Sequence, residues 1–138
     1  MKKLYETTVI NTGGRSGEVH SPDNIFQYDV VAPKELGGEG GSGTNPEQLF
    51  AAGYGACFNS ALELVLSKEK INAKSQIEAT VSLYEDPEDK GFKLGVVLEG
   101  HIEGVDKDKA EELIKKAHEV CPYSKATRGN IDVELKIN

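Results

Sequence analysis

The chain contains two cysteines, Cys57 and Cys121, and these side chains are the ones best suited to covalent chemistry. Cys57 lies between Ala56 and Phe58 in an apolar segment, where a cysteine is either an inert small hydrophobe or a reactive thiol. A free thiol with a pKa of about 8.5 is only a few per cent ionised at pH 7, and an adjacent cation lowers that pKa by about 1 to 3 units. Arg15, in a glycine-rich stretch, is a candidate for that cation.

Metal binding is a poor fit to the sequence. No CxxC or HxxxH pair is present, and the histidines lie far apart in the chain, at His20, His101 and His118. We therefore expect exposed or hydrogen-bonded histidines and no metal site. A cysteine hydrolase or acyl carrier would need a histidine base near Cys57, and no motif places one there.

A glycine-rich stretch, residues 36–43, precedes a predicted helix and has the composition of a phosphate-binding loop. No Gly-Lys-Ser or Gly-Lys-Thr follows it, and Glu39 and Glu47 would lie near any bound phosphate. The stretch is therefore better interpreted as a shaped loop that needs several positive φ angles.

Size and charge exclude further classes of function. A length of 138 residues predicts a single domain, 1–138, with one core. The 23 acidic residues outnumber the 16 basic ones for a net charge of −7, which disfavours nucleic acid and membrane surfaces as partners. No apolar run approaches the roughly 18 residues of a membrane span, and the first residues turn polar early. We expect a cytoplasmic protein, whose thiols the reducing compartment keeps free of a permanent disulfide.

The elements that must position these residues follow from hydrophobic pattern and turn chemistry. Strand-forming residues separated by Gly, Pro, Asn and Asp predict strands at 4–11, 15–20, 25–31, 75–85, 92–103 and 131–137. Apolar residues at helical spacing predict helices at about 46–69 and 107–120, the first capped by Asn45 or Thr44 and the second by Asp106, with Cys121-Pro122 ending it. The order is βββ-α-ββ-α-β, an α+β fold. Gly53 and Gly55 weaken the first helix, which indicates close approach of another group.

Three blocks of sequence resemble one family. They are Gly13–Gly17, the stretch from Leu36 through Thr44-Asn45-Pro46-Glu47-Gln48 to Ala56-Cys57-Phe58, and Cys121–Asn130 with its Cys-Pro-Tyr-Ser start. In this order, over nearly the whole chain, they resemble the organic hydroperoxide resistance proteins of the OsmC-like superfamily. The resemblance implies two antiparallel-rich sheets around a central helix, in an intertwined homodimer.

The resemblance also implies a thiol peroxidase. In that family the cysteine matching Cys57 attacks the distal oxygen of an organic hydroperoxide and becomes a sulfenic acid, and the one matching Cys121 resolves it as a disulfide. Arg15 matches the family's arginine, which would stabilise the thiolate and the leaving oxygen. Glu47 matches its glutamate, which would hold Arg15 by a bidentate pair. Without the resemblance, Cys121 could equally be a helix-ending residue of no consequence.

Family membership implies no bound cofactor, a lipoylated protein as reductant and fatty-acid-type hydroperoxides as substrates. An apolar collar for an alkyl chain could come from Ile25, Leu49, Phe50, Tyr54 and Phe58, although these side chains are equally good core residues. Glu47 and Cys57 lie ten positions apart, about 15 Å along an ideal helix, so either Arg15 spans that distance or the helix begins after Glu47. The rival function is a non-catalytic stress or sensor protein on the same fold.

Overall fold

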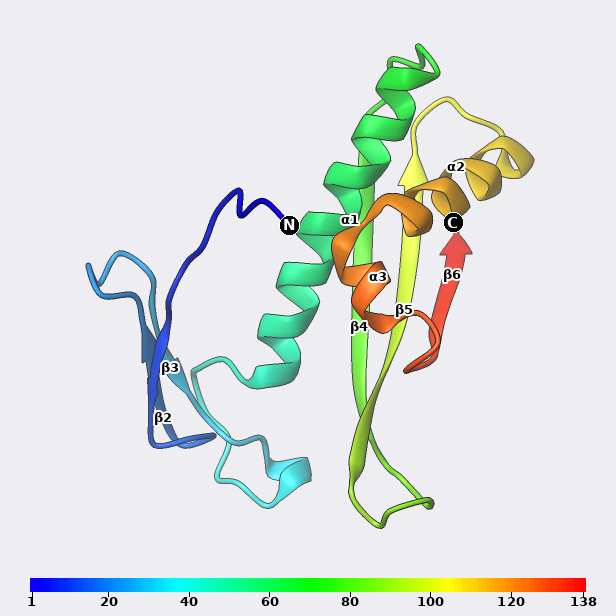
Figure 1. The fold of residues 1–138 in the computed structure, drawn as a ribbon. Helices are drawn as coiled ribbons and strands as arrows, with labels where there is room; N and C mark the ends of the chain where they lie inside the picture. The colour runs from blue at the N-terminus through cyan, green and yellow to red at the C-terminus, as the bar shows by residue number, and fades with distance from the viewer. The chain divides into compact units, whose positions relative to one another are not determined.

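The computed structural model describes residues 1–138, which form two compact units, Met1–Leu49 and Phe50–Asn138. Three strands and a 3-10 helix belong to the first unit: β1 (Ile10–Thr12), β2 (Gly17–His20), β3 (Gln27–Val30) and η1 (Lys34–Leu36). The long helix α1 (Pro46–Lys68) begins at the end of the first unit and continues into the second. The second unit also holds β4 (Ser75–Glu85), β5 (Phe92–Ile102), α2 (Lys107–Val120), α3 (Pro122–Thr127) and β6 (Val133–Ile137) (Figure 1).

The first unit is built on an antiparallel meander, β1-β2-β3. The turn between β1 and β2 contains Gly13 and Gly14, whose positive φ angles of 86° and 61° cause no steric strain in glycine. The meander was expected, but the expectation of a first strand over 4–11 is largely wrong, because only Ile10–Thr12 finds a hydrogen-bonding partner in this chain.

The glycine-rich stretch adopts the irregular loop that its composition predicts. Gly37, Gly40, Gly41 and Gly43 all have positive φ, from 72° to 159°. Thr44 closes the loop through a bridge to Val30 of β3. The loop therefore leads directly from the first sheet to the start of α1.

α1 begins as its sequence predicts. The Asn45 side chain accepts a hydrogen bond from the Gln48 backbone N–H at 2.8 Å, which selects Asn45 over Thr44 as the cap. A single stripe of α1 is buried, at the spacing of one helix face, and consists of Tyr54, Phe58, Ala61, Leu62, Val65 and Leu66. The helix is thus half-buried rather than buried on every side.

The second unit contains a three-stranded sheet in the order β4-β5-β6. The predicted hairpin β4-β5 is antiparallel, and β6 lies parallel to β5 on its other edge. Apolar residues line up across one face of the sheet, as in the row formed by Ala79, Leu98 and Leu135. Figure 1 shows α1, α2 and α3 next to this sheet, and the core lies between the apolar face and these helices.

α2 has the bounds expected from its amphipathic pattern. The Asp106 side chain caps it by accepting from the Lys109 N–H at 2.9 Å. α2 ends at Val120, before Cys121-Pro122, as expected. The six-residue helix α3, which starts directly after the corner at Cys121, was not expected. Proline is favoured in the first turn of a helix, because its missing N–H would be unpaired there anyway. This corner places Cys121 between two helices.

α1 is long and apolar enough, by length and composition, to cross a membrane, so the expectation that no segment would reach this threshold is wrong. The expectation failed because Leu, Val, Phe and Ala residues raise the mean hydropathy of α1, although polar residues such as Asn59 and Glu63 interrupt any continuous apolar run. A core helix passes the same test, and the buried stripe from Tyr54 to Leu66 gives α1 that place in the second unit.

Candidate active site

The two cysteines lie next to each other in the second unit. Cys57 is a half-buried residue of α1, and Cys121 is fully buried at the corner between α2 and α3. Their Sγ atoms are 3.5 Å apart and both thiols are free. A disulfide needs sulfurs about 2.05 Å apart, so the thiols must approach by only about 1.5 Å to form one. The fold thus brings together residues 64 positions apart in sequence.

The surroundings of Cys57 act on its ionisation in opposite directions. Burial is the largest influence and raises the pKa of the Cys57 thiol, and the neighbouring Cys121 raises it further. The backbone N–H of Tyr123, in the first turn of α3, donates to the sulfur and lowers the pKa. No lysine or arginine contributes to this shift. The second unit by itself therefore keeps Cys57 more protonated than an ordinary cysteine.

The first unit holds the predicted ion pair. Arg15 Nη1 and Nη2 donate to Glu47 Oε1 and Oε2 at 2.8 and 3.0 Å, a bidentate arrangement of two parallel hydrogen bonds. Glu47 raises the pKa of Arg15 further, so this guanidinium stays charged. Glu47 lies in the first turn of α1, so the alternative that the helix begins after Glu47 is wrong.

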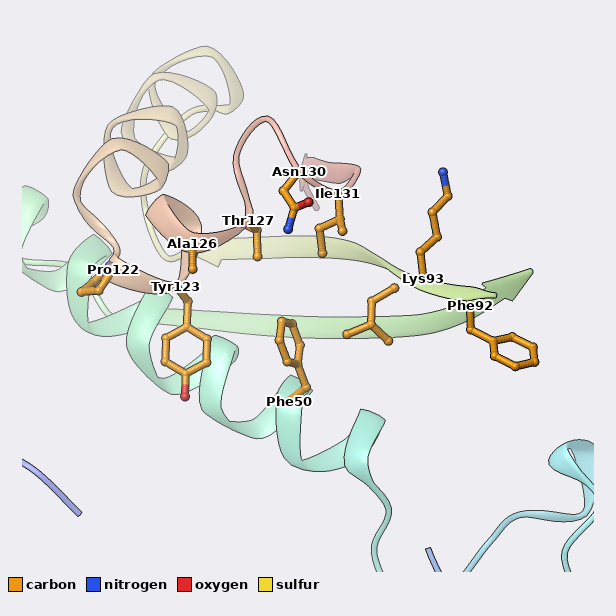
Figure 2. Close-up of a pocket in the computed structure, with 10 residues that line it drawn as sticks. Phe50, Phe92, Lys93, Pro122, Tyr123, Ala126, Thr127, Asn130 and Ile131 are labelled. Carbon is orange, nitrogen blue, oxygen red and sulfur yellow. The ribbon is translucent and has the colours of Figure 1, made fainter. Parts of the chain in front are cut away.

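An apolar cavity of about 740 Å³ opens beside α3 in the second unit (Figure 2). Phe50 of α1 and Tyr123 of α3 lie on one side of it, with their ring centroids 6.2 Å apart in an edge-to-face arrangement. Its other lining residues come from β5, α3 and the segment before β6: Phe92, Lys93, Leu94, Pro122, Ala126, Thr127, Asn130 and Ile131. Tyr123 links this cavity to the thiols, because this residue lines the cavity and its backbone N–H donates to Cys57.

The five residues proposed for an apolar collar are placed differently from one another. Phe50 lines the cavity, whereas Tyr54 and Phe58 are fully buried in the core of the second unit. Leu49 is half-buried at the end of the first unit, and Ile25 is 87% exposed in the turn before β3. Six of the cavity residues follow Cys121, in a region for which the sequence predicted no pocket.

A buried group of hydrogen bonds lies beside the thiols and was not foreseen from sequence. The Tyr54 hydroxyl is 2.8 Å from Ser124 Oγ and 3.0 Å from Thr127 Oγ1. Ser124 Oγ is also 2.8 Å from His118 Nδ1. Burial lowers the pKa of His118, and the positive charge of Arg128 lowers it further. We call Tyr54, His118, Ser124 and Thr127 the α1–α3 network.

The histidines have hydrogen-bonding partners, as expected. His20 contacts Glu18 at 2.8 Å, His101 contacts Asn138 at 3.1 Å, and His118 belongs to the α1–α3 network. No group of three or more His, Cys, Asp or Glu side chains is placed to hold a metal ion.

Fold and site together define a small α+β protein that carries a paired, reduced dithiol. A family model described as OsmC-like protein matches residues 38–136, and the chain belongs to this family. It is 55% identical over 135 residues to an organic hydroperoxide resistance protein-like 2 of Staphylococcus epidermidis, covering 97% of this chain and 95% of the relative.

Solved structures agree with this assignment. An organic hydroperoxide resistance protein of Legionella pneumophila superposes with a TM-score of 0.93 at 53% identity, covering 99% of each chain. The organic hydroperoxide resistance protein OhrB of Bacillus subtilis gives a TM-score of 0.91 at 48% identity, covering 99% of this chain and 100% of the other. The α+β fold inferred from the sequence is thereby confirmed.

Proposed function

We propose that this protein acts in organic hydroperoxide resistance as a thiol-dependent peroxidase. The observation that carries the proposal is the 3.5 Å contact between Cys57 and Cys121, in a chain similar over its whole length to proteins named for organic hydroperoxide resistance. A peroxidase of this type needs one thiol to take an oxygen atom and a second within reach to release it.

In the proposed reaction, the Cys57 thiolate attacks the distal oxygen of ROOH. The O–O bond breaks, the alkoxide takes a proton and leaves as ROH, and Cys57 becomes a sulfenic acid. The Cys121 thiol then attacks the Cys57 sulfur, which forms the disulfide and releases water. A lipoyl dithiol on a partner protein restores both thiols by exchange and becomes a cyclic disulfide. No bound cofactor takes part.

Arg15 and Glu47 complete the proposed site. Burial raises the pKa of Cys57, so a cation is needed to hold the thiolate at neutral pH. Arg15 is the proposed cation, and it would also stabilise negative charge on the leaving oxygen. Glu47 would act through Arg15, because a carboxylate touching the sulfur would raise the thiol pKa instead. The bidentate Arg15–Glu47 pair supports these two roles, because it fixes the plane of the guanidinium.

The cavity beside α3 is the proposed site for the alkyl part of the substrate. Its apolar lining, with Phe50 and Tyr123 near the thiols, suits an extended organic hydroperoxide better than the small polar hydrogen peroxide. The apolar surroundings of the alkyl chain are proposed to include four further residues: Leu49, Tyr54, Phe58 and Ile25.

We propose that the chain works as one domain, in a homodimer, in the cytoplasm. Large apolar side chains are exposed in the first unit, among them Leu4 at 88% and Tyr5 at 81%, in a segment rich in strand-forming residues that has no partner strand in this chain. On α1, Leu64 is 45% exposed on the side away from the buried stripe. A second copy would cover such surfaces.

The test compares consumption of tert-butyl hydroperoxide and hydrogen peroxide, with dihydrolipoamide as the electron donor. Rapid loss of the organic peroxide that disappears in Cys57→Ser, with weaker action on hydrogen peroxide, is the expected result. If fully reduced protein consumes neither peroxide, the function is not a peroxidase, and the raised pKa of Cys57 points instead to a protein whose thiols do not turn over.

A further inference from the structure

We propose that the α1–α3 network is a positioning device for the second step of this reaction, in which Cys121 resolves the oxidised Cys57. Tyr54 and Ser124 are its central residues, and neither is hydrogen-bonded to the reacting sulfurs. The inference rests on the proposed function, because it assigns residues to one step of that reaction.

The network joins the same two parts of the fold that the thiols must join. Tyr54 precedes Cys57 by three residues, so both side chains lie on neighbouring positions of one α1 face. His118 and Ser124 lie three residues before and three residues after Cys121, in α2 and α3. The hydrogen bonds from Tyr54 to Ser124 and from Ser124 to His118 therefore hold both sides of the Cys121 corner against α1.

The corner itself has two other polar restraints: the backbone N–H of Tyr123 donates to Cys57, and the Arg128 side chain donates to the His118 carbonyl at 2.6 Å. Pro122 has no backbone N–H to donate, and the Cys121 carbonyl and N–H bond only within the adjoining helices, to Lys125 and Ala117. The Cys121 thiol has no side-chain partner other than Cys57. The direction in which Cys121 faces α1 is thus set by core packing, by the Tyr123 N–H and by the side chains of the α1–α3 network.

Burial makes these hydrogen bonds hard to replace. Tyr54 and Ser124 are fully buried and Thr127 is 5% exposed, so water has no ready access to the hydroxyl groups. Every buried side-chain nitrogen and oxygen in the protein has a partner. Losing the Tyr54 hydroxyl removes one hydrogen bond from Ser124, which keeps His118, and one from Thr127, which keeps the Ser124 carbonyl. The corner then gains freedom to move away from Cys57. Disulfide closure then loses part of the proximity that makes it fast.

The test uses Tyr54→Phe, which removes only the hydroxyl, and Ser124→Ala, which removes the shared partner. Each protein is equilibrated with dihydrolipoamide and its oxidised form, and the Cys57–Cys121 disulfide is measured by mass spectrometry. We expect each variant to form the disulfide about tenfold less favourably, equivalent to about 30 mV for a two-electron couple. The double variant should lose little more than either single one, because both remove the same hydrogen bond.

A kinetic measurement separates the two steps. The first equivalent of tert-butyl hydroperoxide should be consumed at the wild-type rate in Ser124→Ala, whereas disulfide closure slows and overoxidised Cys57 accumulates at lower peroxide. Tyr84→Phe is the matched control, because this tyrosine is 55% exposed in β4 and has no side-chain hydrogen bond. Ile102→Val, in the core on β5, controls for a general loss of stability.

The outcomes are distinguishable. If the wild type forms no disulfide with peroxide, the proposed function itself is wrong. If the wild type does so and Tyr54→Phe keeps its disulfide equilibrium, or shifts it only as far as Ile102→Val does, the positioning inference is overturned. Should Tyr54→Phe fail to fold, Ser124→Ala decides by the same two measurements.

Discussion

Two glycines of α1 lead to opposite expectations when each is changed to alanine. A Cβ at Gly53 would lie 2.6 Å from Tyr123 Oη and 3.1 Å from Tyr123 Cζ, whereas a Cβ at Gly55 would meet only Ala79 Cβ, at an ordinary 3.7 Å. Alanine in place of glycine inside a helix is favourable by about 1 kcal/mol. Gly55→Ala should therefore stabilise the protein by about 1 kcal/mol and raise Tm by about 4 °C.

Gly53→Ala gains the same helix propensity but must displace the Tyr123 ring by about 1 Å to reach ordinary contact distance. Tyr123 is 39% exposed, so its ring can swing outward, at the expense of its aromatic contacts with Phe50 and Tyr54. Each such contact contributes about 0.5–1.5 kcal/mol. The gain and the loss nearly cancel, so Tm should stay within a few degrees of the wild type.

Activity should distinguish the two variants more sharply. In Gly53→Ala the displaced Tyr123 ring reshapes the cavity, and kcat/KM for an organic hydroperoxide should fall about tenfold, less than the hundredfold that about 1 Å of misplacement at a reacting atom can cost. Gly55→Ala should keep the wild-type value. Thermal melts and initial rates on the two purified variants test this. Equal stabilisation in both, with unchanged activity in Gly53→Ala, would refute the placement of Tyr123.

Three other predictions follow from the site. Cys121→Ser should consume about one equivalent of organic hydroperoxide and then accumulate overoxidised Cys57, and steady turnover with dihydrolipoamide would remove Cys121 from the resolving step. Arg15→Ala, and more weakly Glu47→Gln, should move the pH profile of Cys57 alkylation to higher pH, because the thiolate loses a cation while burial still raises its pKa; an unmoved profile would contradict this part of the mechanism. Light scattering should report a dimer for the wild type at micromolar concentration and a lighter species for Leu64→Glu, whereas a monomeric wild type would contradict the dimer proposal.

Where a local signal decides an element, the sequence predicted it well. Asn45 and Asp106 mark the starts of α1 and α2 because an Asn or Asp side chain satisfies a free N–H of the first turn. The first strand was overestimated because residues 4–9 have strand-forming side chains but no partner strand in this chain. The missed helix α3 did carry a signal, Pro122, but a proline that ends one helix can equally open the next.

The site was predictable to a smaller extent. The pairing of Cys57 with Cys121 and of Arg15 with Glu47 came from resemblance, because no spacing rule joins residues 64 or 32 positions apart. Tyr54 was interpreted as a collar residue, since an aromatic side chain at helical spacing gives no indication of where its hydroxyl points. Its partners Ser124 and Thr127 lie 70 or more positions away and become visible only once the helices have packed.

The distance in sequence between the two thiols has a thermodynamic consequence of its own. In the proposed cycle the disulfide closes a loop of 64 positions, which would restrict the unfolded chain by about 4 kcal/mol in loop-closure entropy. The oxidised form should then melt on the order of 10 °C above the reduced form. During turnover the protein would switch between a less heat-stable reduced form and a more heat-stable oxidised form. A rapid thermal melt of cell extract would then report its redox state.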